Sequence, residues 1–516
     1  MSVLIGMIIL IPLLIIFFSF FHASHSWNHI LENILFSYLI KTVILVIGVS
    51  ILSSFMGIAS AWLITNYNFP GSNYIKWMLI LPLAIPTYIS AYAYSDTIEF
   101  FTPLLIFVRD NFGSDYMALL DTIIVYLTAI FVLSSVLYPY IYLLLRVSFE
   151  TYSNHFIKVS NTLGYSKKES FWKIALPMSR PALVAGLILV TMETLSDFGA
   201  VKHFGIQTFT YGIFRTWFGM GDMVGALKLA LALMIITLSF LYLEQKNRSR
   251  SNFSVKSFNG AIQKEDVSTI KAIFVGIFCL IPLILGFAIP IFKLGYWFII
   301  SIHYIKQINI ITLIYNTIIL AFSTSLITVL LSLFIIFSAK YYRNTMVERI
   351  NKVSTLGYSI PGAVIAMGVI VLVGFLSNNY GIILSGSLII LLYGFVIKFI
   401  AVAYQPIKAG FEKQSINIIS SSRILGSSSV KSLFKINIPI IKNSIISAFL
   451  LVFIDSAKEL PLTLILRPFN FETLSTVTYD LSNQSQIIES SIPSFFIILI
   501  VILPIVFLNK KIEPSK

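Results

Sequence analysis

Glu193 and Asp197 are two carboxylates in an otherwise apolar stretch of the chain, LVTMETLSDFGAV (residues 189–201). Residues four apart lie on one face of a helix, so the spacing predicts a paired acidic site. Only 11% of the residues are charged, and ionisable side chains inside a membrane are costly and commonly mark functional sites. The chemistry open to the pair is therefore cation binding or internal ion pairing.

A second pair of acids lies 262 residues further along the chain. Asp455 and Glu459 are again four residues apart, in LVFIDSAKEL. Lys458 stands where the first copy has Ser196, so the two copies differ in charge. Two interpretations stay open: the four acids could pair internally with Lys458 and backbone donors, or they could line the route of a cation and lower its electrostatic barrier.

The elements that hold these acids have the composition of a membrane protein. Hydrophobic residues make up 57% of the 516 residues, and the mean hydropathy is +0.90. The apolar stretches are continuous and long enough to cross a hydrocarbon core of about 30 Å, which favours helices over alternating barrel strands. The N-terminal stretch has no cleavage site and is interpreted as a retained span. The sequence predicts an all-α polytopic membrane protein with twelve spans, at about 3–21, 38–64, 75–94, 117–145, 181–201, 223–243, 270–292, 308–338, 354–376, 381–404, 441–466 and 490–508.

The basic residues predict the orientation of these spans. If the N-terminus is cytoplasmic, six Lys and Arg residues fall in external loops, four fall within spans, and the others fall in cytoplasmic segments. Cytoplasmic loops carry an excess of Lys and Arg, so we expect a multi-pass protein of the bacterial inner membrane with both termini in the cytoplasm. This distribution accounts for the net charge of +14 without a nucleic-acid partner.

The polar stretch QKNRSRSNFSVKSFNGAIQKED divides the chain into two halves. Its composition is that of a flexible linker. We expect a first half over residues 1–244 with six spans, a cytoplasmic linker over 245–269, and a second half over 270–516 with six spans. The two halves are pseudo-repeats of each other.

Matching cytoplasmic segments precede the fifth and eleventh spans. They read NTLGYSKKESFWKIALP (161–177) and SRILGSSSVKSLFKINIP (422–439), and they align at the same offset of 262 residues. In each copy a Pro follows a Gly by thirteen residues, which predicts a glycine turn and a short helix that ends at the Pro on entering the membrane. The positions of interest are Leu163, Gly164, Ile174, Leu176 and Pro177 in the first copy and Leu425, Gly426, Ile436, Ile438 and Pro439 in the second.

The paired segments resemble the EAA loop of permeases of bacterial ATP-binding-cassette (ABC) importers. In that family the Gly and the I-x-L-P at this spacing mark the coupling helix that docks into the ATPase subunit. The name-giving triplet is absent, since this chain has Lys158-Val159-Ser160 and Ser420-Ser421-Ser422. Any family contact that depends on the glutamate is therefore in doubt, whereas the Gly and Pro framework is intact.

The resemblance extends over essentially the full length to the ferric-iron branch of these permeases. It is carried by TMETLSDFGAVKHFGIQTFTYGIFRTWFGMGD (191–222), DSAKELPLTLILRPFNFETL (455–474) and AWLITNYNFPGSNYIKWMLILPLAIPTYISAYAY (61–94). Related permeases of this branch import thiamine, phosphonates or polyamines. Carboxylate oxygens suit a hard trivalent cation, which agrees with iron as the cargo.

The resemblance implies a transport subunit with a type I importer fold and no chemistry of its own. The chain has no GxxxxGK[ST] motif, so ATP would be bound by two partner ATPase subunits, and no cofactor is expected. A periplasmic or lipid-anchored binding protein would deliver the cargo. One rival is an ion-coupled secondary transporter that uses the four acids as a proton or sodium relay. A membrane-embedded enzyme or scaffold is a weaker rival, since no catalytic constellation is present.

Two further features qualify this interpretation. His22, His25 and His29 follow the first span and form a weak candidate for metal capture, although isolated surface histidines are commoner. Pro86 and Pro361 align at a separate offset of 275 residues, in LAIPTYISA and YSIPGAVIA, and predict kinks in equivalent helices.

Overall fold

The protein is almost entirely helical in the computed structural model, which describes residues 2–162, 164–249, 264–342, 357, 360–412, 414, 418, 421, 422, 424 and 426–512. Within these residues, nine helices are long and apolar enough to cross a membrane, or up to eleven if two bent helix pairs each count as one span. The helix over Gly6–Ser19 is apolar but shorter. The predicted all-α class is confirmed, with nine to eleven candidate spans in place of the expected twelve.

The first part of the chain contains both long helices and short irregular ones. In chain order its elements are α1 (Ser2–Ser19), α2 (Trp27–His29), the π-helix η1 (Ile30–Ile34), α3 (Leu35–Asn66), β1 (Tyr67–Asn68), α4 (Ser72–Met78), the 3-10 helix η2 (Leu81–Ala84), α5 (Thr87–Ala93), α6 (Asp96–Phe100), α7 (Thr102–Phe112), α8 (Ser114–Thr162), α9 (Lys167–Ser170), the π-helix η3 (Phe171–Ala175), α10 (Leu176–Met178), α11 (Arg180–Ser196), α12 (Gly199–His203), α13 (Phe209–Phe214), the π-helix η4 (Arg215–Gly219) and α14 (Met223–Ser249).

The described residues of the second part also form both long helices and short elements. They are β2 (Glu265–Asp266), α15 (Thr269–Leu283), the π-helix η5 (Ile284–Ala288), α16 (Ile289–Ile300), the 3-10 helix η6 (Ile302–Lys306), α17 (Ile310–Tyr342), α19 (Gly362–Tyr380), α20 (Leu388–Glu412), α22 (Ser429–Ser432), the π-helix η8 (Leu433–Asn437), α23 (Ile438–Ala457), α24 (Pro461–Leu466), α25 (Leu474–Asn483) and α26 (Ser491–Ile512).

The helices form two compact units, and each unit draws on both halves of the sequence. One unit comprises residues 29–211 and 235–296, and the other comprises 1–28, 212–234 and 297–516. We call them the Asp197 unit and the Glu459 unit, after the acid that each contains. These two units therefore divide the chain differently from the halves predicted at 1–244 and 270–516. The halves remain a prediction from sequence.

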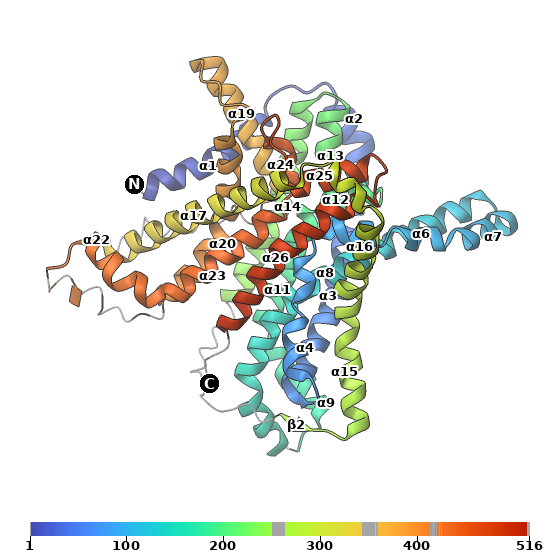
Figure 1. The fold of residues 1–516 in the computed structure, drawn as a ribbon, viewed down its shortest axis with the longest axis vertical. Helices are drawn as coiled ribbons and strands as arrows, with labels where there is room; N and C mark the ends of the chain where they lie inside the picture. The colour runs from blue at the N-terminus through green and yellow to red at the C-terminus, as the bar shows by residue number, and fades with distance from the viewer. Residues whose placement is uncertain are drawn as a thin grey trace. The chain divides into compact units, whose positions relative to one another are not determined.

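The Asp197 unit is built on the long helices α3 and α8, which pack along each other (Figure 1). The helix α11 packs on both, and α15 lies against α3 and α4. A two-stranded parallel sheet adds a small element to this unit, with Tyr67 opposite Glu265 and Asn68 opposite Asp266. The apolar faces of these helices supply the core that positions α11, which carries Glu193 and leads to Asp197.

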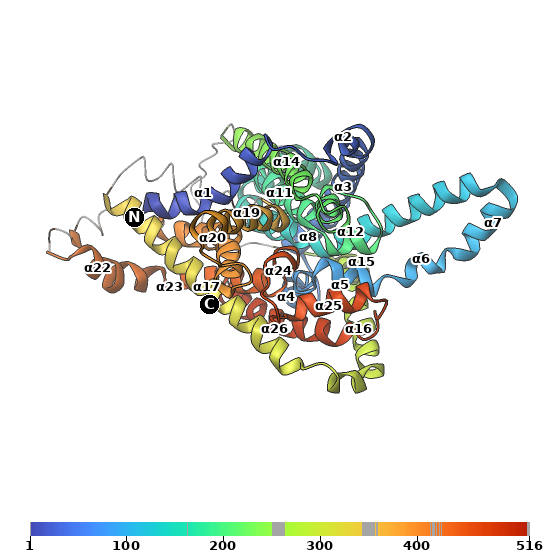
Figure 2. The ribbon, with the colours of Figure 1, turned by 90° about the horizontal axis from the view of Figure 1, so that it is seen from above.

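The Glu459 unit is built on three mutually packed helices, α17, α20 and α23 (Figure 1). The helix α26 packs on α23, and α24 fits against α19 and α20. The first helix of the chain, α1, lies alongside α19 (Figure 2). The unit thus contains the first helix of the other sequence half.

Each unit contains a helix from the opposite half of the sequence, and a glycine allows that helix to approach its neighbour closely. A Cβ at Gly286 of η5 would overlap the carbonyl oxygen of Ser135 in α8, and a Cβ at Gly368 of α19 would overlap that of Pro12 in α1. Only a residue without a side chain fits at such an approach. In each unit, the helix contributed by the opposite half is therefore seated through a backbone contact at a glycine.

Several predicted spans are broken where the sequence suggested one helix. The predicted span at 75–94 is bent by 92° at Ile85–Pro86, because proline removes a backbone donor and disfavours helix in the residue before it. The predicted spans at 181–201 and 441–466 also stop early, at Ser196 and Ala457. Both of these stops fall inside the acidic pairs.

Candidate functional site

The two acids of each pair do not share one helix, which corrects the expectation from their spacing. Glu193 lies on α11 and Asp455 lies on α23. Asp197 has extended backbone angles (φ −67°, ψ 131°) just after α11 ends, and Glu459 follows the end of α23. The second acid of each pair thus stands in a break between a long helix and a short one.

The Asp197 carboxylate caps the short helix α12. Its Oδ1 accepts hydrogen bonds from the backbone N–H groups of Ala200 (2.9 Å) and Val201 (3.1 Å). Its Oδ2 accepts a hydrogen bond from the Thr87 hydroxyl at the start of α5. The first N–H groups of a helix have no partner within the helix, and a buried carboxylate satisfies them. Asp197 is buried in this role.

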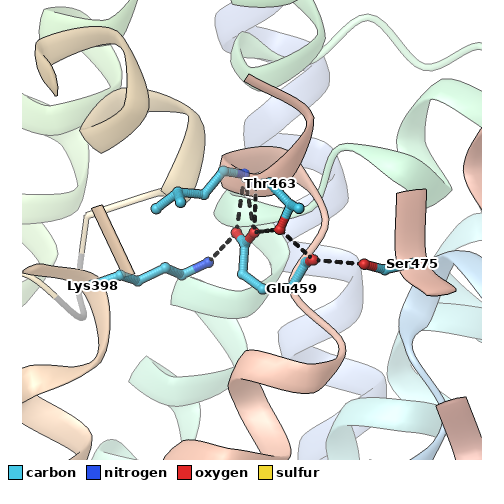
Figure 3. Close-up of polar contacts among 5 residues, drawn as sticks. Lys398, Glu459, Thr463 and Ser475 are labelled. Carbon is cyan, nitrogen blue, oxygen red and sulfur yellow. Dashed lines mark hydrogen bonds and ion pairs between the residues drawn. The ribbon is translucent and has the colours of Figure 1, made fainter. Parts of the chain in front are cut away.

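The Glu459 carboxylate performs the same task for α24 (Figure 3). It accepts hydrogen bonds from the backbone N–H groups of Leu462 (3.0 Å) and Thr463 (3.2 Å). The Thr463 hydroxyl also donates to it, at 3.3 Å. The Lys398 ammonium of α20 lies 2.8 Å from Oε1 and completes a buried ion pair. Glu459 is therefore fixed by a cation as well as by the helix that it caps.

The scaffold around the two acids is repeated. The main-chain carbonyl of Asp197 accepts a hydrogen bond from Thr210 (2.7 Å), and that of Glu459 accepts one from Ser475 (3.0 Å, Figure 3). These donors belong to α13 and α25, whose first N–H groups donate to hydroxyls on the long helices α3 and α17. The bonds are Phe209 N–H to Thr42 (3.2 Å) and Leu474 N–H to Thr317 (2.9 Å). Each half thus builds the same helix–break–helix frame around a carboxylate.

The two sites differ in the group that faces the carboxylate. Thr87 follows Pro86, and the equivalent position after Pro361 is Gly362. A Cβ at Gly362 would lie 2.5 Å from Glu459 Oε1 and 3.0 Å from Lys398 Nζ. The glycine leaves room for the longer glutamate and its lysine, whereas the shorter aspartate meets a threonine hydroxyl.

The first acid of each pair is partly exposed. Glu193 and Asp455 have intermediate burial, and Asp455 pairs with Lys458 at 3.1 Å. Lys458 therefore neutralises Asp455, while Glu459 takes its cation from Lys398. Asp197 and Glu459 therefore belong to a bonded network, whereas Glu193 and Asp455 are partly exposed. A cation route along these acids stays a prediction from sequence.

The two loop segments that resemble coupling helices contain the predicted glycine turns. Gly164 (φ +79°) and Gly426 (φ +73°) are both left-handed, a conformation that glycine adopts without steric cost. Ser166 and Glu169 then close a capping box, with Glu169 accepting from the Ser166 N–H (3.0 Å) and Ser166 accepting from the Glu169 N–H (3.3 Å). Lys173 and the bonds from Ser166 lower the pKa of Glu169 to about 2. The first segment therefore begins with an ordered helix start.

The remaining predicted positions of these segments lie in helices. Ile174 belongs to η3, Leu176 and Pro177 to α10, Ile436 to η8, and Ile438 and Pro439 to the first turn of α23. Leu163 and Leu425 lie outside the described residues. The expected helix end at the proline is wrong for the second copy, because Pro is tolerated in a first helical turn and η8 runs directly into α23. In the first copy the chain bends by 68° after Met178.

The histidines after the first span do not assemble a metal site. Among the described residues, no group of three or more His, Cys, Asp or Glu side chains could hold a metal ion. His25 Nδ1 lies 3.7 Å from the Asp222 carboxylate, and His29 lies 3.3 Å from the Asn33 amide. His22 belongs to the same unit as His25, whereas His29 belongs to the other.

Asp222 forms a polar clamp in this part of the Glu459 unit. Its carboxylate accepts from the Ser24 hydroxyl (2.5 Å), the Ser26 hydroxyl (2.5 Å) and the Gly225 N–H (2.8 Å). It thereby ties the segment after α1 to the start of α14. Burial alone would raise the pKa of Asp222, but hydrogen bonds from Gly225, Ser24 and Ser26 together hold it below its usual value.

We expect Asp222→Ala to lower the free energy of unfolding by about 1–3 kcal/mol, because four donors, which include the Ser26 backbone N–H, lose a buried acceptor. His25→Ala is the matched control, since the His25 side chain is 71% exposed and that of Asp222 is 3% exposed. Chemical unfolding in detergent would measure both. Because the pKa of Asp222 is depressed in the folded protein, this stabilisation is fully present above the ordinary aspartate pKa of about 3.9 and is lost progressively as the pH falls from there through the lower folded pKa. Equal losses in both variants would contradict the clamp.

Two features of the site were not predicted from sequence, the Lys398 ion pair and the breaks inside the acidic pairs. Lys398 lies within the predicted span at 381–404, and nothing local to it points to a glutamate 61 residues away. The breaks had a signal that could have been used: Pro461 disfavours helix at the residue before it, and the Asp-Phe-Gly of residues 197–199 is a common helix-start composition.

Known proteins resemble this chain in two ways. Residues 53–244 match the family model described as the binding-protein-dependent transport system inner membrane component. The Fe(3+)-transport system permease protein FbpB 2 of Haemophilus influenzae is 24% identical over 477 residues, covering 91% of this chain and 89% of that protein.

Shorter matches involve permeases that are named for sulfate and for molybdenum transport. The sulfate transport system permease protein CysT of Escherichia coli is 29% identical over 154 residues, which cover 30% of this chain and 52% of that protein. The molybdenum transport system permease protein ModB of Haemophilus influenzae is 28% identical over 152 residues, or 29% of this chain and 62% of that protein. The chain thus matches about half of these relatives' length and nearly all of the ferric-iron permease.

Proposed function

We propose that this chain, which belongs to the inner-membrane permeases of binding-protein-dependent ABC transport systems, imports ferric iron. As the permease component it is not an enzyme. Its partners are a substrate-binding protein and ATPase subunits that supply the energy. The single observation that carries the cargo proposal is the match to a ferric-iron permease over nine-tenths of both chains.

The charge of the site supports a cation as the cargo. Carboxylates in a membrane pathway attract cations and repel anions, so the sulfate permease is a less suitable guide to this chain's substrate. Hard oxygen ligands also suit a trivalent cation. Thiamine and polyamines are the competing cations, and phosphonate is the competing anion of the same transporter class.

We infer different roles for the acids of each pair. Glu193 and Asp455 line the translocation pathway, because both are partly exposed on the long helices α11 and α23. Asp197 and Glu459 hold the adjoining short helices in place through their N-terminal N–H groups. Lys458 moderates the charge of Asp455. Rapid release of cargo requires such weak, transient contacts in place of a closed coordination site.

The two coupling segments would receive two ATPase subunits on the cytoplasmic side. Their equivalent left-handed glycines at 164 and 426 support this role, and the excess of Lys and Arg in the same set of loops supports the orientation with cytoplasmic termini. Closure of the ATPases on ATP would move these segments and switch the pathway between inward and outward access. This coupling is the reason to prefer an ATP-driven importer over a secondary transporter.

The cargo is tested by uptake competition in cells that depend on this permease for iron. Accumulation of radioactive ferric iron should be blocked by excess unlabelled ferric iron and left unchanged by excess thiamine, spermidine, a phosphonate or sulfate. Uptake of one of those competitors, with no uptake of iron, would replace the cargo and retain the transporter class. Uptake that continues in cells depleted of ATP with an intact membrane potential would favour the secondary transporter.

A further inference from the structure

Equivalent loops follow the two capped helices, at an offset of 265 residues. The stretch KHFGIQT (202–208) contains the last two residues of α12 and the loop after them, and RPFNFET (467–473) is the loop after α24. Gly205 (φ +67°) and Asn470 (φ +64°) occupy the same left-handed turn position. Asparagine is one of the few residues other than glycine that adopts this conformation readily. The two loops therefore have the same turn.

Both loops are held by equivalent residues of the long helices. In the Asp197 unit, Lys41 of α3 donates to Gln207 Oε1 at 3.1 Å. In the Glu459 unit, Asn316 of α17 donates to the Glu472 carbonyl at 2.9 Å. The second loop has further supports, since Arg467 pairs with Asp480 of α25 at 3.2 Å and Thr473 forms a capping box. The second loop is thus a fixed structure.

The aromatic residue before the turn is placed differently in the two loops. Phe204 is 6% exposed, whereas its counterpart Phe469 is 94% exposed. The first copy therefore shows that a phenylalanine can be buried at this position, whereas the second copy leaves its phenylalanine exposed. A rigid loop that presents a fully exposed phenylalanine pays a hydration penalty that contact with a partner would remove.

The exposed phenylalanine borders a polar cavity of about 920 Å³ in the same unit. Its wall includes the Arg467–Asp480 ion pair and the amide side chains of Gln307 and Asn309. An exposed aromatic ring beside hydrogen-bonding groups is the usual composition of a protein-docking site. A partner would need an apolar recess for the ring and polar groups around that recess.

The position of the loop along the chain identifies the side that it faces. The coupling segment η8 leads directly into α23, and from the far end of α23 the chain passes through the break at Glu459 and the short helix α24 to the Phe469 loop. The twenty residues of α23 span about 30 Å, the thickness of the hydrocarbon core. If the coupling segment meets an ATPase, the Phe469 loop lies on the opposite face of the membrane, where a binding protein delivers cargo.

We propose that the loop over residues 467–473 is a docking element for the substrate-binding protein, with Phe469 as its anchor. The inference rests on the proposed import function, because it assigns the two membrane faces from the coupling segments. It makes the two halves unequal: the second half would hold the binding protein through Phe469, and the equivalent Phe204 would serve packing alone.

The test is a binding measurement on the assembled transporter. The permease with its ATPases would be placed in nanodiscs, and the dissociation constant for the purified binding protein encoded beside it would be measured with and without ferric iron. Phe469→Ala should weaken binding by about tenfold or more, as expected for an aromatic anchor, and Phe469→Tyr should restore most of the affinity. Tyr380→Ala is the matched control, since Tyr380 is 67% exposed in the same unit and does not line the cavity.

A photo-crosslinking residue at position 469 would show the partner directly. Crosslinks from 469 to the binding protein, with none from 380, would support the proposal. Unchanged affinity in Phe469→Ala, or crosslinks from 469 to an ATPase subunit, would overturn it. Failure of the cargo proposal is distinguishable: a binding protein that carries another substrate would still lose affinity with Phe469→Ala, while ferric iron would have no effect on docking.

Discussion

Replacing Lys398 with methionine is expected to lower the free energy of unfolding by about 3–5 kcal/mol, because Glu459 would remain buried without its cation. The Lys398 and Glu459 side chains are 12% and 2% exposed, and their charged atoms are 2.8 Å apart. Denaturant unfolding of the purified permease in detergent, followed by intrinsic tryptophan fluorescence, would measure the change.

Lys458→Met is the matched control for this prediction. Lys458 also pairs with an acid of the same helix region, at 3.1 Å from Asp455, but the side chains are 17% and 15% exposed. A partly solvated pair contributes about 1 kcal/mol or less, so the control should be much milder. The double variant Lys398→Met/Glu459→Gln should recover much of the loss, since the amide oxygen still accepts from the α24 N–H groups. Equal losses in the two single variants would show that the Lys398 pair is not the buried support inferred here.

Amide substitutions should separate the four acids into two classes. Glu193→Gln and Asp455→Asn should cut cargo uptake by about tenfold or more with little change in stability, because each removes a pathway charge whose interaction with a nearby cation is worth a few kcal/mol. Asp197→Asn and Glu459→Gln should lower stability and reduce uptake only in proportion to the folded protein that remains. Uptake into proteoliposomes, normalised to folded transporter, measures both effects.

Asp455→Asn needs its own control, because it also releases Lys458. The variant Asp455→Asn/Lys458→Met removes both charges and should transport as poorly as Asp455→Asn if the carboxylate is the functional group. Recovery in the double variant would instead make the stranded Lys458 charge the cause of the defect. Unchanged uptake in Glu193→Gln and in both Asp455 variants would end the pathway interpretation.

Much of the architecture could be predicted because it follows from patterns local to the chain. Continuous apolar stretches predicted helices, and a single offset matched the coupling segments to each other. The prediction of glycine turns at Gly164 and Gly426 is confirmed, since both residues have left-handed φ values. Such features depend on a few neighbouring residues, so the sequence contains enough information to predict them.

The breaks inside the acidic pairs were not predicted because the helical period hides them. Four residues between Glu193 and Asp197 fit one helix face, yet the chain becomes extended at Asp197. The break is stabilised by hydrogen bonds, because the Thr87 hydroxyl and the first N–H groups of α12 all donate to the Asp197 carboxylate. Spacing alone does not contain those partners.

The cation that pairs with Glu459 could not be predicted from local sequence patterns either. Lys458 is the sequence neighbour of Glu459, and the sequence left open which of the acids this lysine neutralises; in the structure it pairs with Asp455. The actual cation, Lys398, comes from α20, and Gly362 of α19 leaves the space for it. Three separate helices define this contact, so it follows from packing. The exchange of α1 and α15 between the two units depends on packing in the same way.

The central claim is that the chain is the permease of an ATP-driven ferric-iron importer. The most direct test reconstitutes it in proteoliposomes with its ATPases and binding protein and measures the uptake of radioactive ferric iron. The expected result is uptake that requires ATP, requires the ferric-loaded binding protein, and falls about tenfold in Glu193→Gln. Iron uptake that proceeds without ATP, or ATP-dependent uptake of another cargo with iron left outside, would contradict the account.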